Sequence, residues 1–291
     1  MTKHQLLHRI KEKVVFFLGD IRRLRTFPWV TWAVEQKRIS YEEAMEGVRI
    51  AQPGDIGIHL DEGFLSNFAI PGFFKHAWIH VAPETVVEAV SEGVIRRHAL
   101  YPIHSDFTII LRPPAGTVTP KDVDLAVKYA ERIVGCEYDA DFSFDIEEEY
   151  ANLEHLDGPK FGVRCKVVTL GNATTATASF NVDEGRRMAI RAAMMDNLRI
   201  SREEITNLQD SADNLKQSFG AFSCTETVSF AWWHRRKELK IGRKKYAGKE
   251  IIAADDFLNG FDIVWKSKSV TADAVRKKLP EIIVQKIADF K

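Results

Sequence analysis

One cysteine in the last third of the chain has the surroundings that thiol chemistry requires. Ser223 is a residue type that caps helices, and the residues after Cys224 suit a helix, so the thiol is expected in the first helical turn. There the unpaired N–H groups and the helix dipole favour the thiolate, which is the nucleophilic form of cysteine. Cys224 is therefore a candidate nucleophile. The alternative is a small buried apolar residue, the commonest fate of a free cysteine.

A thiolate nucleophile needs an imidazole base, and one of the nine histidines is well placed to supply it. His76 opens an apolar strand directly after a turn that contains Pro71 and Gly72, so its ring is expected on a rigid strand end. Glu88 interrupts the next apolar strand. A hairpin through residues 83–84 would bring this carboxylate near His76, where it could orient the ring. The alternative for Glu88 is a solvent-facing position in its strand.

The sequence predicts neither a metal site nor a cofactor. His80 shares a strand face with His76 but lies ~13 Å from it, at about 3.3 Å per residue, which excludes joint ligation of one ion. The three cysteines lack CxxC spacing, so a cysteine-rich zinc site and a disulfide framework are both disfavoured. We interpret Cys136 and Cys165 as structural residues, because no base is evident for either thiol.

The elements that must position these side chains are short strands in the middle of the chain, with helices at both ends. Hydrophobic alternation predicts strands at 56–60, 77–81, 85–90, 107–111 and 261–265, and a hairpin within 161–180. Helical spacing and capping residues predict helices at 4–25, from Ser40 onward, and at 120–134, 183–198, 202–217 and 271–290. This order indicates an α+β fold.

Five short motifs around these residues resemble, in sequence and in order, those of a known family. It is the YiiX-like proteins, the circularly permuted branch of the NlpC-type papain-like cysteine peptidase superfamily. The motifs are Pro53-Gly54-Asp55-Ile56, Lys75-His76-Ala77-Trp78-Ile79, Val87-Glu88-Ala89-Val90 with Gly93-Val94, Gly135-Cys136-Glu137-Tyr138-Asp139 with Phe142, and Ser223-Cys224-Thr225-Glu226. The sequence departs from the family at Thr225, where the family has serine.

The resemblance implies a permuted papain-like fold, in which a small antiparallel sheet or barrel packs against helices. It implies Cys224 as nucleophile, His76 as general base and Glu88 as the residue that orients the base. The backbone N–H of Cys224 would contribute to the oxyanion hole, and Tyr138 would line the substrate site. Residues 51–291 would form the catalytic domain, with an insertion at about 146–219 and a helical N-terminal extension at 1–50.

The expected function is that of a cysteine hydrolase that cleaves an amide bond, for example in cell-wall-type peptides. One alternative is a lipid-directed acyltransferase or thioesterase of the same fold, for which the basic amphipathic helix at 4–25 would be a peripheral membrane contact. A second alternative is a non-catalytic interaction protein that keeps the fold. The expected ligand is a peptide or acyl-type small substrate, and the sequence does not specify an oligomeric state.

The composition limits which other classes of function the protein could have. The 41 basic and 41 acidic side chains give a formal net charge of zero, which removes the whole-chain argument for nucleic-acid binding. A local basic run at 234–249 is either a site for an anionic polymer or headgroup, or a solvated surface. No apolar run reaches the roughly 18–20 residues of a membrane span, and residues 14–18 are too short for a secretory signal, so we expect a cytoplasmic protein.

Overall fold

A computed structural model describes two main stretches of the chain. These are residues 37–139, apart from 65–66, 68–69 and 92, and residues 221–290, apart from 247–248. Two further pairs of antiparallel strands are described, namely β1 (Ile21–Arg23) with β2 (Val30–Trp32), and β9 (Phe161–Thr169) with β10 (Asn172–Phe180). The second pair confirms the predicted hairpin within 161–180. The predicted helices at 183–198 and 202–217, and residues 4–20 of the first predicted helix, lie outside the described residues.

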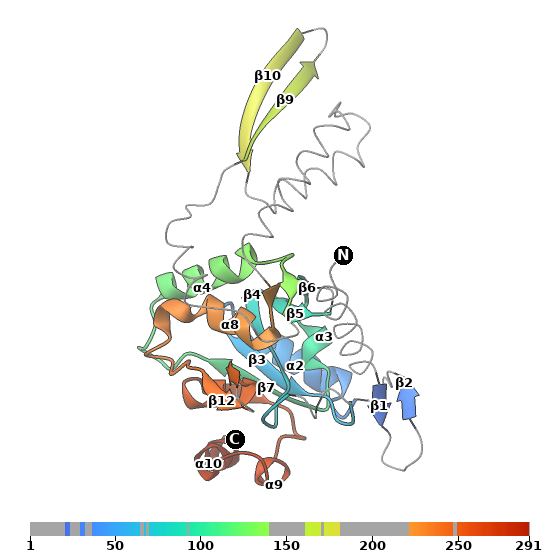
Figure 1. Cartoon of the computed structure of the whole chain (residues 1–291), viewed down its shortest axis with the longest axis vertical. Coiled ribbons are helices and arrows are strands. Elements are labelled where there is room, and N and C mark those ends of the chain that lie inside the picture. The colour runs from blue at the N-terminus through green and yellow to red at the C-terminus, as the bar shows by residue number, and fades with distance from the viewer. Residues whose placement is uncertain are drawn as a thin grey trace.

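A six-stranded antiparallel sheet forms the centre of the molecule (Figure 1). Its strands, in spatial order, are β14 (Asp262–Lys266), β7 (Phe107–Arg112), β3 (Ile56–Leu60), β4 (His76–Ala82), β5 (Thr85–Val90) and β6 (Gly93–His98). The strands predicted at 56–60 and 85–90 have the predicted bounds, and the other three differ by one residue at one or both ends. β6 was not predicted. The mixture of this sheet with helices confirms the α+β class.

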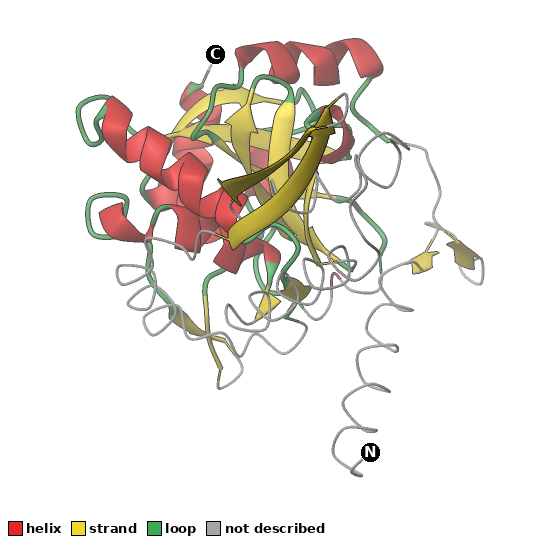
Figure 2. Cartoon of the chain, turned by 90° about the horizontal axis from the view of Figure 1, so that it is seen from above, coloured by secondary structure: helices red, strands yellow, loops and turns green. Residues whose placement is uncertain are grey.

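Helices cover both faces of the sheet, as Figure 2 shows from a second direction. On one face α8 (Cys224–Ala231) packs across β4 and β5, with α4 (Pro120–Arg132) beside it. On the other face lie α2 (Tyr41–Ile50) and α3 (Leu100–Ile103). Alternation along the strands gives each face its own core: Ala77 and Ile79 join the core with α8, whereas Trp78 joins the core with α2.

Shorter elements complete the described fold. β8 (Glu137–Tyr138) pairs in parallel with β11 (Ala221–Phe222), directly before α8. After α8 come η2 (Trp233–Arg235), the hairpin of β12 (Lys244–Tyr246) and β13 (Lys249–Ile251), and η3 (Ala254–Asn259). The chain ends with α9 (Ala272–Val275) and α10 (Glu281–Asp289). No helix among the described residues is long and apolar enough to cross a membrane.

Two local features fix β3 in the middle of the sheet. The carboxylate of Asp55 is buried, and both of its oxygens lie 2.7 Å from nitrogens of the Arg112 guanidinium, which joins the start of β3 to the end of β7. Gly57 leaves the space that the indole of Trp78 fills, since a Cβ at this position would lie 1.9 Å from Trp78 Cζ2. A side chain at position 57 would therefore separate β3 from β4.

Two sequence predictions about helices are wrong. Residues 21–23 form strand β1, so the helix predicted at 4–25 does not extend to its predicted end, and the extension at 1–50 is not helical throughout because 30–32 form β2. The helix predicted at 271–290 is two helices, α9 and α10, because Pro280 has no N–H to donate and stands at the N-terminal cap of α10. The helix predicted from Ser40 is present as α2, capped by the Ser40 side chain.

Candidate active site

The β4–β5 hairpin brings His76 and Glu88 together. Trp78 is the register partner of Glu88, so Glu88 lies on the same face of the sheet as His76, one diagonal step away. His76 Nε2 lies 2.6 Å from Glu88 Oε2, and the Glu88 side chain is 2% exposed. The predicted proximity of the two side chains is therefore present in the structure. The alternative of a solvent-facing Glu88 is wrong.

The N-terminus of α8 carries Cys224. Ser223 caps the helix: its hydroxyl accepts a hydrogen bond from the Glu226 N–H, and the Glu226 carboxylate accepts one from the Ser223 N–H. Cys224 is thereby held as the first helical residue, as predicted, and its sulfur lies 3.9 Å from the carbonyl oxygen of Lys75, the residue before His76. Cys224 is 5% exposed and also lines the cleft described below.

The pKa of His76 depends on its neighbours Cys224 and Glu88. Burial by itself lowers the pKa of His76. The negative charge of the Cys224 sulfur, a side-chain hydrogen bond with Cys224 and the contact with Glu88 outweigh this effect and raise the pKa of His76 to about 10. Since Nε2 contacts Glu88, Nδ1 is the ring nitrogen that remains for proton exchange with the sulfur.

Glu88 has a second cationic partner on β6. Arg97 Nη1 lies 3.0 Å from Glu88 Oε1 in ion-pair contact, although the angles are not those of a hydrogen bond. Burial by itself raises the pKa of Glu88. The contact with His76 and the positive charges of His76 and Arg97 lower this pKa by more than burial raises it, so the net shift is downward. Glu88 is therefore ionised at neutral pH and favours the protonated, correctly oriented form of His76.

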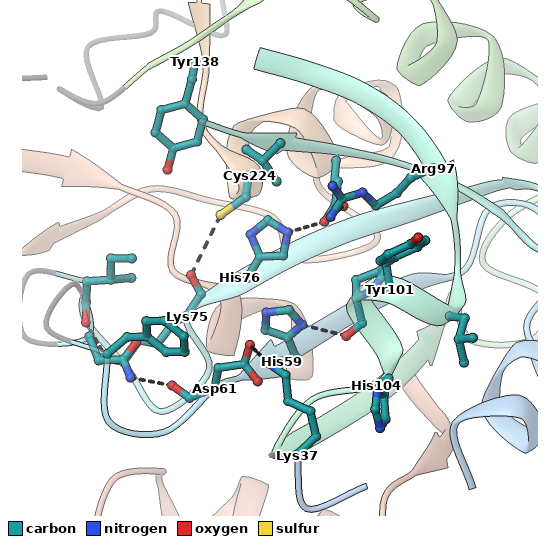
Figure 3. Close-up of a pocket in the computed structure, with 17 residues that line it drawn as sticks. Lys37, His59, Asp61, Lys75, His76, Arg97, Tyr101, His104, Tyr138 and Cys224 are labelled. Carbon is teal, nitrogen blue, oxygen red and sulfur yellow. Dashed lines mark hydrogen bonds and ion pairs between the residues drawn. The ribbon is translucent and has the colours of Figure 1, made fainter. Parts of the chain in front are cut away.

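Tyr138 lies beside the sulfur. β8 pairs with β11 so that Tyr138 is the register partner of Phe222, two residues before Cys224. Burial and the negative charges of Cys224 and Glu226 raise the pKa of Tyr138, which keeps its hydroxyl protonated. Because Cys224 and Tyr138 both line the cleft, the structure places the predicted substrate-lining residue next to the candidate nucleophile (Figure 3).

A cleft of about 810 Å³ opens over these residues. Figure 3 shows Cys224, His76 and His59 in order along it, with Lys75 and Asp61 on one side and Tyr101 on the other. Its wall combines polar and charged side chains with apolar ones, and the described lining residues are Lys37, His59, Asp61, Phe64, Asn67, Ile70, Lys75, His76, Glu88, Val90, Arg97, Leu100, Tyr101, Pro102, His104, Tyr138 and Cys224. The size is that of a small-molecule or peptide site.

Three of these residues were missed by the sequence analysis. His59 is the register partner of His76 on β3, with 4.9 Å between the ring centroids. Arg97 comes from the unpredicted strand β6. Lys75 is buried, which lowers its pKa to about 8, and its ammonium donates to the carbonyl oxygens of Ile70 and Gly72. The signal for His59 was its position in a predicted strand, but strand pairing across the intervening loop was needed to interpret it.

The loop before His76 is held by a buried carboxylate. Asp255 Oδ2 accepts a hydrogen bond of 2.5 Å from the Phe73 N–H, and Oδ1 accepts one of 2.8 Å from the Phe74 N–H. Burial raises the pKa of Asp255 to about 6. This anchor fixes the backbone that leads into Lys75 and His76, so Asp255 is a positioning residue for the candidate site.

The other residues singled out in the sequence lie elsewhere. His80 is buried, and its Nε2 accepts a hydrogen bond of 3.2 Å from the Trp78 indole, away from the cleft. Cys136 is 2% exposed and belongs to the hydrophobic core, in agreement with a structural role, whereas the side chain of Cys165 is not described. Within the described part of the chain, no three His, Cys, Asp or Glu side chains are grouped so that they could hold a metal ion.

Comparisons with models of protein families, with curated proteins and with solved structures found no match to this chain.

Proposed function

We propose that the protein is a cysteine-dependent hydrolase that cleaves an amide bond through Cys224, His76 and Glu88. One arrangement carries the proposal: a cysteine at a capped helix N-terminus lies beside a histidine (Figure 3), and Nε2 of this histidine is 2.6 Å from a buried carboxylate. A nucleophile, a base and a residue that orients the base are the parts that covalent acyl transfer requires. A cysteine that served only to fill the hydrophobic core would require neither a charged histidine beside it nor a position in the wall of a cleft.

The chemical steps follow from these positions. The Cys224 sulfur attacks the carbonyl carbon and forms a C–S bond, while the imidazolium of His76 gives its Nδ1 proton to the leaving amine as the C–N bond breaks. The product of this step is a thioacyl enzyme. Water then attacks the same carbon, His76 accepts its proton, and the C–S bond breaks to release the acid and restore the Cys224–His76 ion pair.

The start of α8 supplies a donor for the negative charge that develops on the attacked oxygen. Cys224 is the first helical residue, so its N–H has no acceptor within the helix. The helix dipole adds to the stabilisation at this end. We assign the oxyanion hole to the backbone N–H of Cys224, and we place the Tyr138 hydroxyl in the wall of the substrate site.

The arrangement supports the permuted branch of the papain-like fold. His76 and Glu88 come first in the chain, on adjacent antiparallel strands, and Cys224 comes last, on a helix that packs across both strands. This order is the reverse of that in papain. The sheet and helix relation and the order of the motifs support the resemblance to the YiiX-like proteins.

The lining of the cleft supports a polar amide substrate, such as a peptide of the kind found in bacterial cell walls. Lys37, Asp61 and Arg97 stand in the wall, where they can exchange hydrogen bonds with a polar substrate, whereas a long acyl chain would remove water from these charged groups and offer them no hydrogen bond. A lipid-directed acyltransferase or thioesterase is therefore less well supported. Its membrane contact was predicted on residues 4–25, of which only the strand residues 21–23 are described.

Alkylation tests the proposal. Iodoacetamide should modify Cys224 in the native protein faster than Cys136, and mass mapping of the labelled peptides would identify the site. The His76→Ala variant should lose this preference at neutral pH, because the imidazolium that stabilises the anionic sulfur is gone. Retention of a native circular dichroism spectrum is the control. A Cys224 thiol that stays unmodified in the native wild-type protein would remove the catalytic assignment.

A further inference from the structure

A second histidine in the cleft has one ring nitrogen whose state is fixed by the backbone. His59 Nδ1 lies 2.7 Å from the carbonyl oxygen of Pro102. A carbonyl oxygen only accepts hydrogen bonds, so Nδ1 carries the proton and, in the neutral ring, Nε2 is a bare acceptor. Burial, assisted by the positive charge of His76, lowers the pKa of His59 to about 4, so the ring is neutral at physiological pH.

The bare nitrogen is not used by the part of the chain that the structure describes. Among the described residues, His59 Nε2 has no hydrogen-bond partner, while the residue lines the cleft. His76 does not use it, because His76 Nε2 contacts Glu88 and Nδ1 is the nitrogen left to exchange a proton with Cys224. An acceptor that is left unpaired in a partly buried wall is available for a ligand that carries a donor.

The position of His59 relates this acceptor to one part of the substrate. His76 must protonate the leaving group, so the leaving group departs on the His76 side of the sulfur. His59 lies beyond His76 on that side, with 4.9 Å between the rings, and Figure 3 shows the order Cys224, His76, His59. Asp61, paired with Lys37 at 2.5 Å, lies nearby in the same part of the wall.

We infer that His59 is the specificity residue of a leaving-group subsite, where its Nε2 accepts a hydrogen bond from an N–H or O–H of the leaving amine. The substrate class is therefore an amide whose amine part carries a donor beyond the scissile nitrogen, as a peptide does through its next backbone N–H. A plain alkylamine has no such donor. This inference rests on the proposed function, since the subsite is defined by the step that His76 performs.

Acetyl transfer tests the subsite without knowledge of the natural substrate. The enzyme is acetylated with p-nitrophenyl acetate and offered glycinamide or glycine N,N-dimethylamide as the acceptor. In each transfer the amine nitrogen bonds to the acetyl carbon, the C–S bond breaks, and the amine proton passes to His76. The two acceptors share the attacking amine and differ in the amide N–H, so the ratio of the two transfer products, measured by mass spectrometry, reports on that donor.

In the wild-type enzyme we expect glycinamide to be favoured by about 10-fold or more, as for the loss of one specific hydrogen bond. His59→Phe keeps a ring against His76 but removes the acceptor, and it should bring the ratio to about one. His59→Gln, which restores a side-chain acceptor, should recover part of the preference. A merely structural role for His59 would lower both rates and leave the ratio unchanged.

Two outcomes overturn the inference. One is an equal ratio in wild type and His59→Phe, and the other is an acetylated wild-type enzyme that transfers to neither acceptor or to both equally. Failure of the proposed function is a separate result: no acetyl group would form on Cys224 in the first place, and Cys224→Ala would release p-nitrophenol as fast as wild type.

Discussion

The Nε2 atom of His76 lies 2.6 Å from Oε2 of Glu88, a carboxylate whose side chain is 2% exposed. A buried carboxylate is costly unless it is paired, and here its two partners are His76 and Arg97. The same contact fixes the direction of the imidazole and favours its charged form. Structure and proposed chemistry therefore depend on the same pair of side chains.

Removing the negative charge of Glu88 should impair turnover more than removing the positive charge of Arg97, its second ion-pair partner. We expect Glu88→Gln to lower kcat/KM by about 10²-fold or more, because the imidazolium is neither oriented nor stabilised in the acid–base steps. The matched control is Arg97→Met, which leaves the contact with His76 intact and should cost less than about 10-fold. Steady-state hydrolysis of an activated ester gives the comparison. Equal losses in the two variants would contradict the assigned role of Glu88.

The charge state of the histidines should be unusual. His76 should titrate near pH 10, whereas His59 should remain neutral down to about pH 4. Nitrogen-15 NMR of histidine-labelled protein would show both. Alkylation of Cys224 removes the neighbouring negative charge and should lower the pKa of His76, and Glu88→Gln should act in the same direction.

The raised pKa of His76 also predicts that the free energy of unfolding depends on pH. The folded-state pKa of His76 is above the unfolded value of ~6.5, so the contribution of its charged form is complete below pH ~6.5 and is lost as the pH rises to about 10. The excess in the free energy of unfolding of wild type over His76→Gln should therefore shrink across this interval. An excess that grows with pH would show that the imidazole is neutral in the folded protein.

Asp255 should be required for the order of the loop that leads to His76. In Asp255→Ala the N–H groups of Phe73 and Phe74 lose their acceptor, at a cost of about 1–3 kcal/mol for each unpaired group. Asp255→Asn keeps one carbonyl oxygen and should retain part of the effect. Amide hydrogen exchange at residues 73 and 74 is the measurement, and unchanged protection in the alanine variant would exclude the anchor.

The close contact of β3 with β4 predicts a sharp difference between two glycines. Gly57→Ala places a Cβ against the indole of Trp78 and should lower the free energy of unfolding by about 1–3 kcal/mol or more. Gly242→Ala is the control, since nothing lies within 4 Å of its added Cβ. Chemical denaturation of the two variants decides, and equal stability would mean that Trp78 moves aside at no cost.

Local rules were sufficient for the parts of the site that depend on short segments. The cap at Ser223 placed Cys224 on the first turn of α8, and the tight hairpin with its two-residue period placed Glu88 near His76. His59 and Arg97 could not be found in this way. Their proximity depends on the pairing of β3 with β4 and of β5 with β6, and the second pairing includes a strand that was not predicted.

The errors in the helix predictions also have physical causes. Three-residue strands are too short to show a period, so helical spacing was extended through Ile21–Arg23, where pairing with Val30–Trp32 decides the structure. At the C-terminus the apolar spacing continues on both sides of Pro280, but a proline in a helix interior removes a hydrogen bond and clashes with the preceding turn. The pattern alone therefore overestimated both helices.

Detection of an acyl enzyme would test the assignment of Cys224 as the nucleophile most directly. Wild-type protein treated with p-nitrophenyl acetate should release a burst of p-nitrophenol that matches the enzyme concentration, and peptide mapping should locate one acetyl group on Cys224. Cys224→Ala should show no burst, and Cys136→Ala should retain it, because Cys136 is a core residue outside the cleft. A wild-type protein without a burst, or an acetyl group on a residue other than Cys224, would show that Cys224 is not the nucleophile.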